Sequence, residues 1–321
     1  IKDALLVDKL NLFSDMVVFS SYAMQVIMSF LMLAMIFMMV PRASVSAKRI
    51  NEVINTPDVI KDGTSTDGSL VGTVEFKNVS FKYPDAEEYL LEDISFTANK
   101  GETVAIIGST GSGKSSLINL VPRFYEATKG SVLVDGVDVR DYKLESLNEK
   151  IGYVSQKAVL FRGTIKSNIL YGSNDKNISD EKINEALEVS QASEFVQKLD
   201  DGINAMVSQG GTNYSGGQKQ RLSIARAIAK DPEIYIFDDS FSALDYKTDA
   251  KLRHDLRAYA KDATMLIVAQ RIGTILNADK IIVLESGKCV GMGTHKELLE
   301  NCDVYKQIAL SQISEEELKN A

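Results

Sequence analysis

The most apolar stretch of the chain lies near its beginning. Residues 16–40 contain no charged side chain and consist mainly of Met, Leu, Val, Ile and Phe. About 20 apolar residues are enough for a helix to cross a bilayer, so this stretch is predicted to be a transmembrane helix. A buried helix of a soluble domain is the alternative, which a run of this length without a charge disfavours. A signal peptide would be shorter and would follow basic residues.

The first half of this stretch also carries polar side chains, namely Ser20, Ser21, Tyr22, Gln25 and Ser29. Polar groups in a spanning helix usually face neighbouring helices or a water-filled cavity. One helix alone offers no such neighbours, and the chain starts with Ile1 rather than Met. We therefore expect the chain to be the C-terminal part of a longer membrane protein.

Beyond Pro41 the apolar residues keep a helical spacing, at Val45, Ile50, Val53 and Ile54. This spacing predicts that the helix continues past the membrane to about residue 56. Pro57 and a run of Gly, Ser, Thr and Asp over 62–68 then favour a linker. The expected organisation is a last transmembrane helix with its extension over 1–56, a linker over 57–68, a second domain over 69–311 and a polar tail over 312–321.

Downstream of the linker the pattern changes from helical to alternating. Apolar residues alternate from Val71 to Tyr83, which predicts two short strands before a turn at Pro84-Asp85. Asp135-Gly136 is a hairpin signal. Further strands are predicted over 90–97, 103–107, 151–156, 234–237, 265–269 and 281–284, and an amphipathic helix over 179–199. The strands at 90–97 and 103–107 are expected to continue the sheet that begins with the strands before Pro84. Strands that alternate with helices indicate an α/β fold.

Composition narrows the expected partners and cofactors. Hydrophobic residues make up 45% of the chain and charged residues 25%, as in ordinary globular proteins, and the net charge is −8. No run rich in Lys or Arg is present, so nucleic acid is not an expected partner. His254 and His295 are the only histidines, so a histidine-based metal site is not expected. Cys289 and Cys302 lack C-x-x-C spacing and are expected to be reduced thiols on a cytosolic face.

One stretch, Gly108 to Ser115, reads GSTGSGKS and fits G-x-x-x-x-G-K-[ST]. It lies between the predicted strand 103–107 and a predicted helix, 116–121, that Pro122 interrupts. In that context the glycines let several backbone N–H groups point at one anion, and the helix start adds partial positive charge. A chance glycine-rich turn is the alternative, but every fixed position matches. We therefore expect Lys114 to reach the β- and γ-phosphates of a nucleotide, and Ser115 to ligate Mg²⁺.

Two further stretches are candidates for chemistry. Asp238 follows the apolar residues 234–237, and a carboxylate at the tip of a buried strand is where a phosphate-loop enzyme holds its metal ion. Tyr214-Ser-Gly-Gly-Gln218 precedes a helical pattern and offers a hydroxyl and glycine N–H groups. It is therefore a candidate second anion site at a helix start, with a plain glycine-containing helix entry as the alternative.

Together these residues resemble an ABC transporter of the exporter type, in which a membrane domain is fused ahead of an ATPase domain. The resemblance covers nearly the whole chain and includes Pro41-Arg42-Ala43 after the last spanning helix. It implies an α/β P-loop NTPase with a RecA-like core, an antiparallel β subdomain and a helical subdomain, preceded by one transmembrane helix. It also implies ATP and Mg²⁺ as cofactors, an integral location in the lipid of the cell membrane, with several spans in the full-length protein, and a cytoplasmic ATPase domain.

The resemblance also implies roles for individual residues. Tyr83 is similar to the aromatic residue that stacks on adenine, and Gln156 to the glutamine that touches Mg²⁺, beside Ser115 and Asp238. The implied ATP-binding residues are Tyr83, Gly108, Ser109, Thr110, Gly111, Ser112, Gly113, Lys114, Ser115 and Ser116. The implied signature motif, which acts on ATP bound by a partner, comprises Tyr214, Ser215, Gly216, Gly217 and Gln218, and the implied inter-domain loop comprises Ser242, Ala243, Leu244 and Asp245.

The chain departs from the family pattern at two implied catalytic positions. Asp239 stands where the family usually has the glutamate that activates water, and Gln270 stands where it usually has histidine. Aspartate is one methylene shorter, and a base must come within about 2.6–3.2 Å of its proton. Glutamine can hydrogen-bond a phosphate but cannot shuttle a proton. A lesser departure is Val207-Ser-Gln209, where similar exporters tend to have glycine and glutamate.

In such a family each ATP lies between the phosphate loop of one ATPase domain and the signature motif of another. Asp239 and Gln270 would then weaken one composite site, while the intact motif 215–218 would serve the other. We expect the slow-site half of a heterodimeric exporter that pairs with a different subunit. A homodimer with two slow sites and a non-transport, ATP-gated regulator or channel module are the alternatives. The sequence does not identify the exported substrate.

Overall fold

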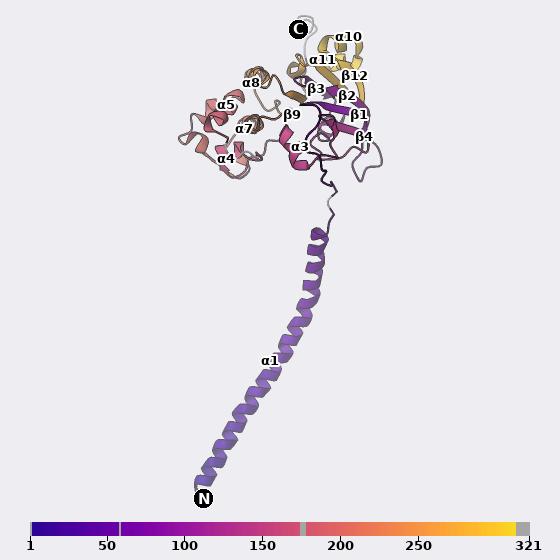
Figure 1. The fold of residues 1–321 in the computed structure, drawn as a ribbon. Coiled ribbons are helices and arrows are strands. Elements are labelled where there is room, and N and C mark those ends of the chain that lie inside the picture. Colours follow the sequence, from indigo (N-terminus) through magenta and orange to yellow (C-terminus); the bar gives the residue numbers. More distant parts are fainter. Residues whose placement is uncertain (1, 58, 174–177, 313–321) are drawn as a thin grey trace. The chain divides into compact units, whose positions relative to one another are not determined.

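The computed structural model describes residues 2–57, 59–173 and 178–312. These form two compact units, Ile1–Val59 and Ile60–Ala321. The first unit consists of one helix, and the second contains the sheets and the remaining helices (Figure 1). Most of the tail that the sequence predicts over 312–321 lies outside the described residues.

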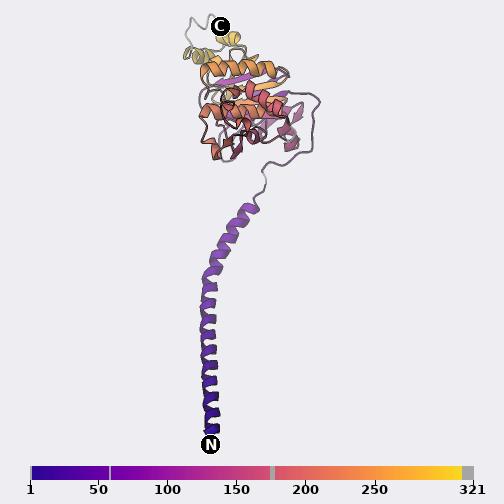
Figure 2. The ribbon, with the colours of Figure 1, turned by 90° about the vertical axis from the view of Figure 1, so that its left-hand side faces the viewer.

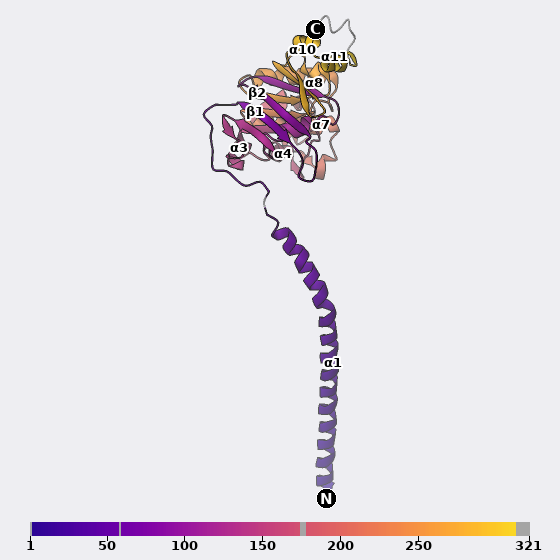
Figure 3. The same ribbon diagram turned by 90° about the vertical axis from the view of Figure 1, so that its right-hand side faces the viewer.

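The first unit is the helix α1, Lys2–Ile54, which includes Pro41. The expected continuation through Pro41 is therefore confirmed. Figures 2 and 3 show that α1 bends toward its C-terminal end, as expected for a helix that contains a proline, which cannot donate the i→i−4 hydrogen bond. From Leu6 to Ile54 it is long and apolar enough to cross a membrane, and its apolar window is not buried within the chain.

The second unit contains a six-stranded sheet in the order β12-β11-β3-β10-β9-β6. All neighbours are parallel except β12, which pairs antiparallel with β11. The strands are β3 (Thr103–Gly108), β6 (Ile151–Val154), β9 (Ile234–Asp238), β10 (Thr264–Val268), β11 (Lys280–Glu285) and β12 (Lys288–Gly293). These match the strands that the sequence predicts at 103–107, 151–156, 234–237, 265–269 and 281–284 to within a few residues.

A second, antiparallel sheet has the order β2-β1-β4-β5. Its strands are β1 (Val74–Phe81), β2 (Leu91–Ala98), β4 (Lys129–Val134) and β5 (Val137–Asp138). The predicted hairpin at Asp135-Gly136 joins β4 and β5 and is confirmed, with both residues at positive φ. A short ribbon of β7 (Gly163–Thr164) and β8 (Met206–Val207) completes the strands of the described chain.

Two strand predictions need correction. The region Val71 to Tyr83 forms one strand, β1, rather than two. Its pairing with β2 continues across a register shift between Phe76 and Val79, where Asn78 adopts a φ of 48°. This irregularity interrupts the alternation that the sequence pattern depends on. Furthermore, β2 and β3 do not continue one sheet. The turn at Lys100-Gly101 moves the chain from the antiparallel sheet to the parallel one.

The helices of the second unit are mostly short. They are α2 (Lys114–Ile118), α3 (Leu144–Lys150), α4 (Ile165–Ile169), α5 (Asp180–Val189), α6 (Ser193–Val196), α7 (Gly216–Lys230), α8 (Tyr246–Tyr259), α9 (Ile272–Ile275), α10 (His295–Asn301) and α11 (Asp303–Leu310), with 3₁₀ turns η1 (Gly202–Asn204) and η2 (Gln209–Gly211). Figure 1 shows α4, α5 and α7 grouped on one side and β1, β2 and β4 on the other.

Two helix predictions were partly wrong. The helix predicted over 179–199 starts as expected after Ser179, whose hydroxyl accepts a hydrogen bond from the Lys182 N–H, but it breaks at Gln191, which has a φ of 58°. The helix predicted over 116–121 instead begins at Lys114 and ends at Ile118, before Pro122. Local turn geometry, which the apolar spacing does not report, sets both boundaries.

Two apolar cores cover the two faces of the parallel sheet. Along β3, Val104 and Ile106 belong to one core, whereas Ala105 and Ile107 belong to the other. The first core is shared with the antiparallel sheet, and the second with helices such as α5, α7 and α8. Because both faces are covered, the central strands β3, β9 and β10 are continuous buried runs without a polar face. The polar residues that follow the strands are therefore confined to the sheet's edge.

Residues of the predicted linker are hydrogen-bonded to the second unit. The Gly63 N–H donates to the Tyr142 carbonyl at 3.0 Å, and the Lys143 N–H donates to the Ser65 carbonyl at 2.8 Å. The Leu144 N–H donates to Asp62 Oδ1 at 2.7 Å. The compact unit therefore includes residues before Ser69, because the short segment 62–65 binds along the chain at 141–144 through its backbone.

Candidate functional site

The phosphate loop lies at the carboxyl end of β3 and leads directly into α2. Gly113, the residue before α2, has a φ of 95°. A Cβ at this position would lie 2.6 Å from Leu91 Cδ2. Backbone conformation and space both require glycine here, so the last glycine of the pattern is fixed by the fold.

The Lys114 ammonium lies inside the curve of this loop. Its Nζ donates to the Gly108 carbonyl at 2.8 Å and to the Ser109 carbonyl at 2.7 Å, and the residue is 8% exposed. Burial lowers the pKa of Lys114, while Asp239 and Asp238 oppose that shift. A cation held among backbone groups at a helix start is suited to contact an anion.

Ser115 and Asp238 face each other beside the loop. The Ser115 Oγ donates to Asp238 Oδ1 at 2.7 Å. Asp238 is the last residue of β9 and is buried, and burial is the main cause that raises its pKa. A hydroxyl and a carboxylate oxygen in this arrangement are the hard oxygen donors that Mg²⁺ prefers, so the side chains fit such an ion.

The Asp239 carboxylate is hydrogen-bonded to two amide side chains. Its Oδ2 accepts hydrogen bonds from Gln156 Nε2 at 3.1 Å and from Gln270 Nε2 at 2.8 Å. Gln156 follows β6, Asp239 follows β9 and Gln270 follows β10, and these strands are neighbours in the parallel sheet. The carboxyl ends of parallel strands lie at the same edge, which is why residues far apart in the sequence converge here.

The backbone of Asp239 adopts a φ of 46°, and its N–H donates to the Val268 carbonyl at 3.0 Å. Asp and Asn adopt this left-handed conformation more readily than most residues. Burial is the main cause that raises the pKa of Asp239, and the hydrogen bonds that its carboxylate accepts oppose that shift. The carboxylate is therefore a stronger proton acceptor than an exposed aspartate.

Tyr83 lies over the helix that follows the loop. Its hydroxyl is 2.9 Å from Ser116 Oγ. Its ring packs edge to face against Phe81 and Tyr125, with centroid distances of 5.0 and 5.1 Å. Tyr125 is a residue that the sequence analysis missed, because no spacing rule connects it to Tyr83.

A second missed residue lies behind the carboxylates. The Tyr153 hydroxyl donates to Asn119 Oδ1 at 2.9 Å. Burial raises the pKa of Tyr153, and the nearby charge of Asp238 adds to that shift. A tyrosine inside a predicted strand ordinarily indicates packing, so the sequence carries no signal for this contact.

The stretch 214–218 forms the start of α7. Ser215 is its N-cap, and the Gln218 side chain accepts from the Ser215 N–H at 2.9 Å, which completes a capping box. A Cβ on Gly217 would lie 3.3 Å from the Ala243 carbonyl. The start of α7 therefore packs beside the loop Ser242–Asp245, and Asp245 in turn caps α8.

The two groups of candidate residues are separate in their hydrogen bonding. Within the described chain, the hydrogen bonds that join Ser115, Asp238, Asp239, Gln156 and Gln270 include no residue of 214–218. Ser215 is exposed at its helix start. The start of α7 can thus face an anion bound outside this loop.

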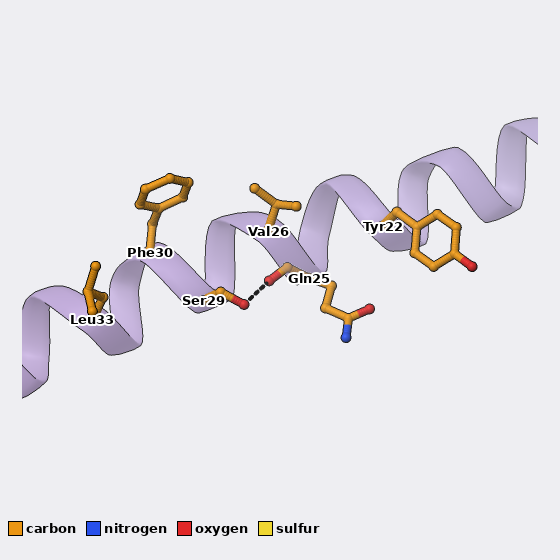
Figure 4. Close-up of a pocket in the computed structure, with 6 residues that line it drawn as sticks. All are labelled: Tyr22, Gln25, Val26, Ser29, Phe30 and Leu33. Carbon is orange, nitrogen blue, oxygen red and sulfur yellow. Dashed lines mark hydrogen bonds between the residues drawn. The ribbon is translucent and has the colours of Figure 1, made fainter.

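A shallow pocket on α1 includes three of the polar residues of the apolar stretch, Tyr22, Gln25 and Ser29. It is lined by Tyr22, Gln25, Val26, Ser29, Phe30 and Leu33 (Figure 4). The Ser29 hydroxyl donates back to the Gln25 carbonyl at 2.8 Å, as serine commonly does within a helix. Tyr22, Gln25 and Ser29 recur at helical spacing and so share one side of α1.

A phosphate loop at the end of a parallel strand, beside a carboxylate on a nearby strand, defines a P-loop nucleotide-binding protein. The family model for ABC transporters matches residues 91–242, a range that begins at β2 and includes the loop, Asp238 and 214–218. The chain therefore contains an ABC transporter ATP-binding domain with the P-loop ATPase fold, as the sequence predicted.

Known proteins agree with this assignment. An uncharacterised ABC transporter ATP-binding protein of Mycobacterium tuberculosis is 48% identical over 303 residues, which are 93% of this chain and 52% of that protein. The ATP-dependent lipid A-core flippase of Haemophilus influenzae is 43% identical over 253 residues, or 79% of this chain and 43% of that protein. The chain thus spans about half the length of these curated relatives.

A solved structure is also similar. The structure of a bacterial Atm1-family ABC exporter with ATP bound matches with a TM-score of 0.81 and 33% sequence identity. The match covers 88% of this chain and 50% of the exporter chain. This coverage extends well beyond the residues that the family model matches.

Proposed function

We propose that the chain is the ATP-binding and ATP-hydrolysing half of an ABC exporter, in which ATP-driven pairing of two ATPase domains drives substrate efflux. The observation that carries this proposal is the arrangement of Lys114, Ser115, Asp238 and Asp239 around one loop. The membrane-length helix α1 and the similarity to exporters support the transport part.

Nucleotide binding rests on the loop and on Tyr83. The backbone N–H groups of residues 108–116 and the Lys114 ammonium hold the phosphates, because they form a preorganised positive cradle. The Tyr83 ring offers an aromatic face to the adenine base. The hydrogen bond between Tyr83 and Ser116 keeps that ring close to the loop.

Mg²⁺ fits beside the phosphates, where Ser115 and Asp238 would hold it and the Gln156 carbonyl oxygen would complete the protein ligands. When bound, the ion neutralises charge on the β- and γ-phosphate oxygens. Asp238 is then ionised, because a cation next to it offsets the cost of burying its charge.

Asp239 is the proton acceptor for the attacking water in this proposal. Its raised pKa favours that role. The aspartate side chain is short, however, and a misplacement of about 1 Å can reduce a rate roughly a hundredfold. Gln270 orients Asp239 by donating to it but transfers no proton. Hydrolysis at this site is therefore slow.

The second proposed role of the chain, contact with ATP held by a partner, belongs to the intact start of α7. Ser215 and the following N–H groups contact the γ-phosphate of ATP held by a partner ATPase domain. The slow site and the intact motif belong to different composite sites, which favours pairing with a different subunit that carries the working base. The ATPase domain lies in the cytosol, where ATP is found, and α1 lies in the lipid.

The direct test is transport in sealed inside-out vesicles that contain the chain and its co-purifying subunit. ATP-dependent accumulation of a candidate substrate, lost with Lys114→Ala, is the expected result. A conductance that ATP opens without accumulation against a gradient would instead identify a gated channel. Two identical copies in the purified assembly would favour a homodimer with two slow sites.

A further inference from the structure

The C-terminal end of the described chain reaches the loop that carries Gln270. Gln312 follows α11, and both ends of its side-chain amide are used. Its Nε2 donates to the Gln270 carbonyl at 2.8 Å, and its Oε1 accepts from the Ile272 N–H at 2.9 Å. One side chain therefore bridges both sides of Arg271.

The loop needs such a partner because its own sequence does not cap the helix after it. Ile272 begins α9, and the residue before it, Arg271, makes no side-chain cap hydrogen bond. The first N–H groups of a helix have no acceptor within the helix. Gln312 Oε1 supplies one of these acceptors from a distant part of the chain.

Gln312 itself is held in place by the packing of α11. Tyr305 and Ala309 on this helix are fully buried, and they belong to the same apolar core as Ile272 and Ile275 of α9. Figure 3 shows α10 and α11 adjacent to each other near the C-terminus. The packing of α11 against this core therefore fixes the position of Gln312 beside the loop.

The same loop holds the catalytic contact. Gln270 accepts from Gln312 through its backbone carbonyl and donates through its side chain to Asp239 at 2.8 Å. We propose that Gln312 is a positioning residue for hydrolysis, which holds the loop 270–272 so that the Gln270 amide reaches Asp239. This inference rests on the proposed function of Asp239 and Gln270.

The test uses Gln312→Ala in the full chain, purified with its partner subunit. The matched control is Gln307→Ala, the same change at an exposed position of α11. Every variant also carries Ser215→Ala, which under the proposed function silences the partner's site and leaves turnover at the site of Asp239. If the steady-state turnover left in this background is too slow to compare, the same variants are compared by single-turnover hydrolysis with the protein in excess over ATP.

We expect Gln312→Ala to lower kcat about fivefold, in line with the loss of one or two hydrogen bonds, with KM for ATP unchanged. Gln312→Glu keeps the acceptor for Ile272 but not the donor for Gln270, and its kcat should be intermediate. In a Gln270→Ala background Gln312→Ala should have no further effect. An unchanged kcat in Gln312→Ala, or a loss that Gln307→Ala shares, would overturn the proposal.

A second readout reports on the loop directly. Trypsin cleaves after exposed arginine, and Arg271 is exposed within this loop. Cleavage after Arg271 should be several-fold faster in Gln312→Ala than in Gln307→Ala, because the loop opens more often. Equal cleavage rates would show that Gln312 does not restrain the loop. If instead the parent protein hydrolysed no ATP in a way that depends on Lys114, the proposed function itself would be contradicted.

Discussion

At the scale of single residues, Asp239 combines a strained backbone with a buried charge. Its φ of 46° suits Asp or Asn, and both of its amide partners donate to the same oxygen. Its raised pKa means that folding disfavours the ionised form, mainly through burial. The carboxylate thus costs stability at neutral pH in the protein without nucleotide.

Asp239→Asn should therefore raise the melting temperature of the nucleotide-free chain at pH 7. Asn keeps the left-handed backbone and an oxygen for both amides, but it removes the buried charge. The rise should be a few degrees, since about 1 kcal/mol corresponds to about 2–4 °C in a domain of this size. The measurement is thermal unfolding of the purified chain, with the exposed Asp303→Asn as the control.

The pH dependence of the stability gained by Asp239→Asn tests whether the buried charge of Asp239 is its cause. A group whose pKa is higher in the folded protein contributes most stability below its unfolded pKa, and that contribution is lost as the pH rises through the folded value. The advantage of Asp239→Asn should accordingly shrink as the pH falls below the raised pKa of Asp239. An advantage that grows toward acid would mean that the charge of Asp239 stabilises the fold.

Lys114 is the residue whose loss should affect nucleotide binding most directly. Lys114→Ala should weaken Mg-ATP binding at least tenfold, because a charge-assisted contact to phosphate inside the loop is lost. Calorimetric titration of the purified chain is the measurement, and Lys100→Ala, at an exposed turn before β3, is the control. Equal affinity in Lys114→Ala and the parent would refute the phosphate-cradle role.

At the scale of elements, the site depends on the residues just after each strand. Three neighbouring strands end in buried residues, and the next one or two positions carry Gln156, Asp239 and Gln270. The start of α7 is arranged differently. Ser215 and Gln218 form a capping box, in which the side chain of each accepts a hydrogen bond from the backbone N–H of the other. This helix start can remain ordered without ATP, as the proposed contact with a partner-bound phosphate requires.

Ser215→Ala should consequently lower steady-state ATP hydrolysis of the assembled transporter more than Asp239→Asn does. Ser215 serves the partner's working site in the proposed heterodimer, whereas Asp239 serves a site that already turns over slowly. The measurement is phosphate release at matched amounts of assembled protein. A larger loss from Asp239→Asn would exclude the asymmetric model and would favour a homodimer in which Asp239 is the working base.

Nucleotide binding by the chain with Ser215→Ala shows whether this change only removes the contact with the partner's ATP or also disrupts the start of α7. Loss of the N-cap costs about 1 kcal/mol of helix stability, which is small against the packing of α7. The chain with Ser215→Ala should therefore bind Mg-ATP as the parent does. Weaker binding would indicate that the change disturbs the fold rather than the partner's site.

At the scale of the whole molecule, the two compact units expose different kinds of surface. The unit Ile60–Ala321 has two apolar cores of its own, whereas α1 exposes its apolar side chains along its length. Such a surface is stable in lipid and not in water. The proposed arrangement places α1 in the membrane and the ATPase domain in the cytosol.

A cysteine introduced on the ATPase domain tests this arrangement. The native thiols are poor reporters, because Cys302 is buried and burial raises the pKa of Cys289. His254, on α8, has a side chain that is 83% exposed. In a variant with His254→Cys, a reagent that cannot cross membranes should label the chain only after the cells are permeabilised. Labelling in intact cells would reverse the proposed orientation.

Much of the fold was predictable because it depends on short-range patterns. The apolar run of α1, the strands of the parallel sheet and the phosphate loop are each continuous in sequence. The loop's glycines and Lys114 act within a few residues of one another, so their spacing identifies them. The predictions failed where a turn or an irregularity interrupts the pattern, as at Asn78 and Gln191.

The sequence by itself determined the class of site and predicted the residues that would carry it. It could not determine that Gln156 and Gln270 share one oxygen of Asp239, that Tyr125 packs on Tyr83, or that Gln312 bridges Gln270 and Ile272. These contacts join positions that are distant along the chain. Only the strand order of the sheet and the packing of α11 bring them within hydrogen-bond or van der Waals distance, and no local spacing encodes either.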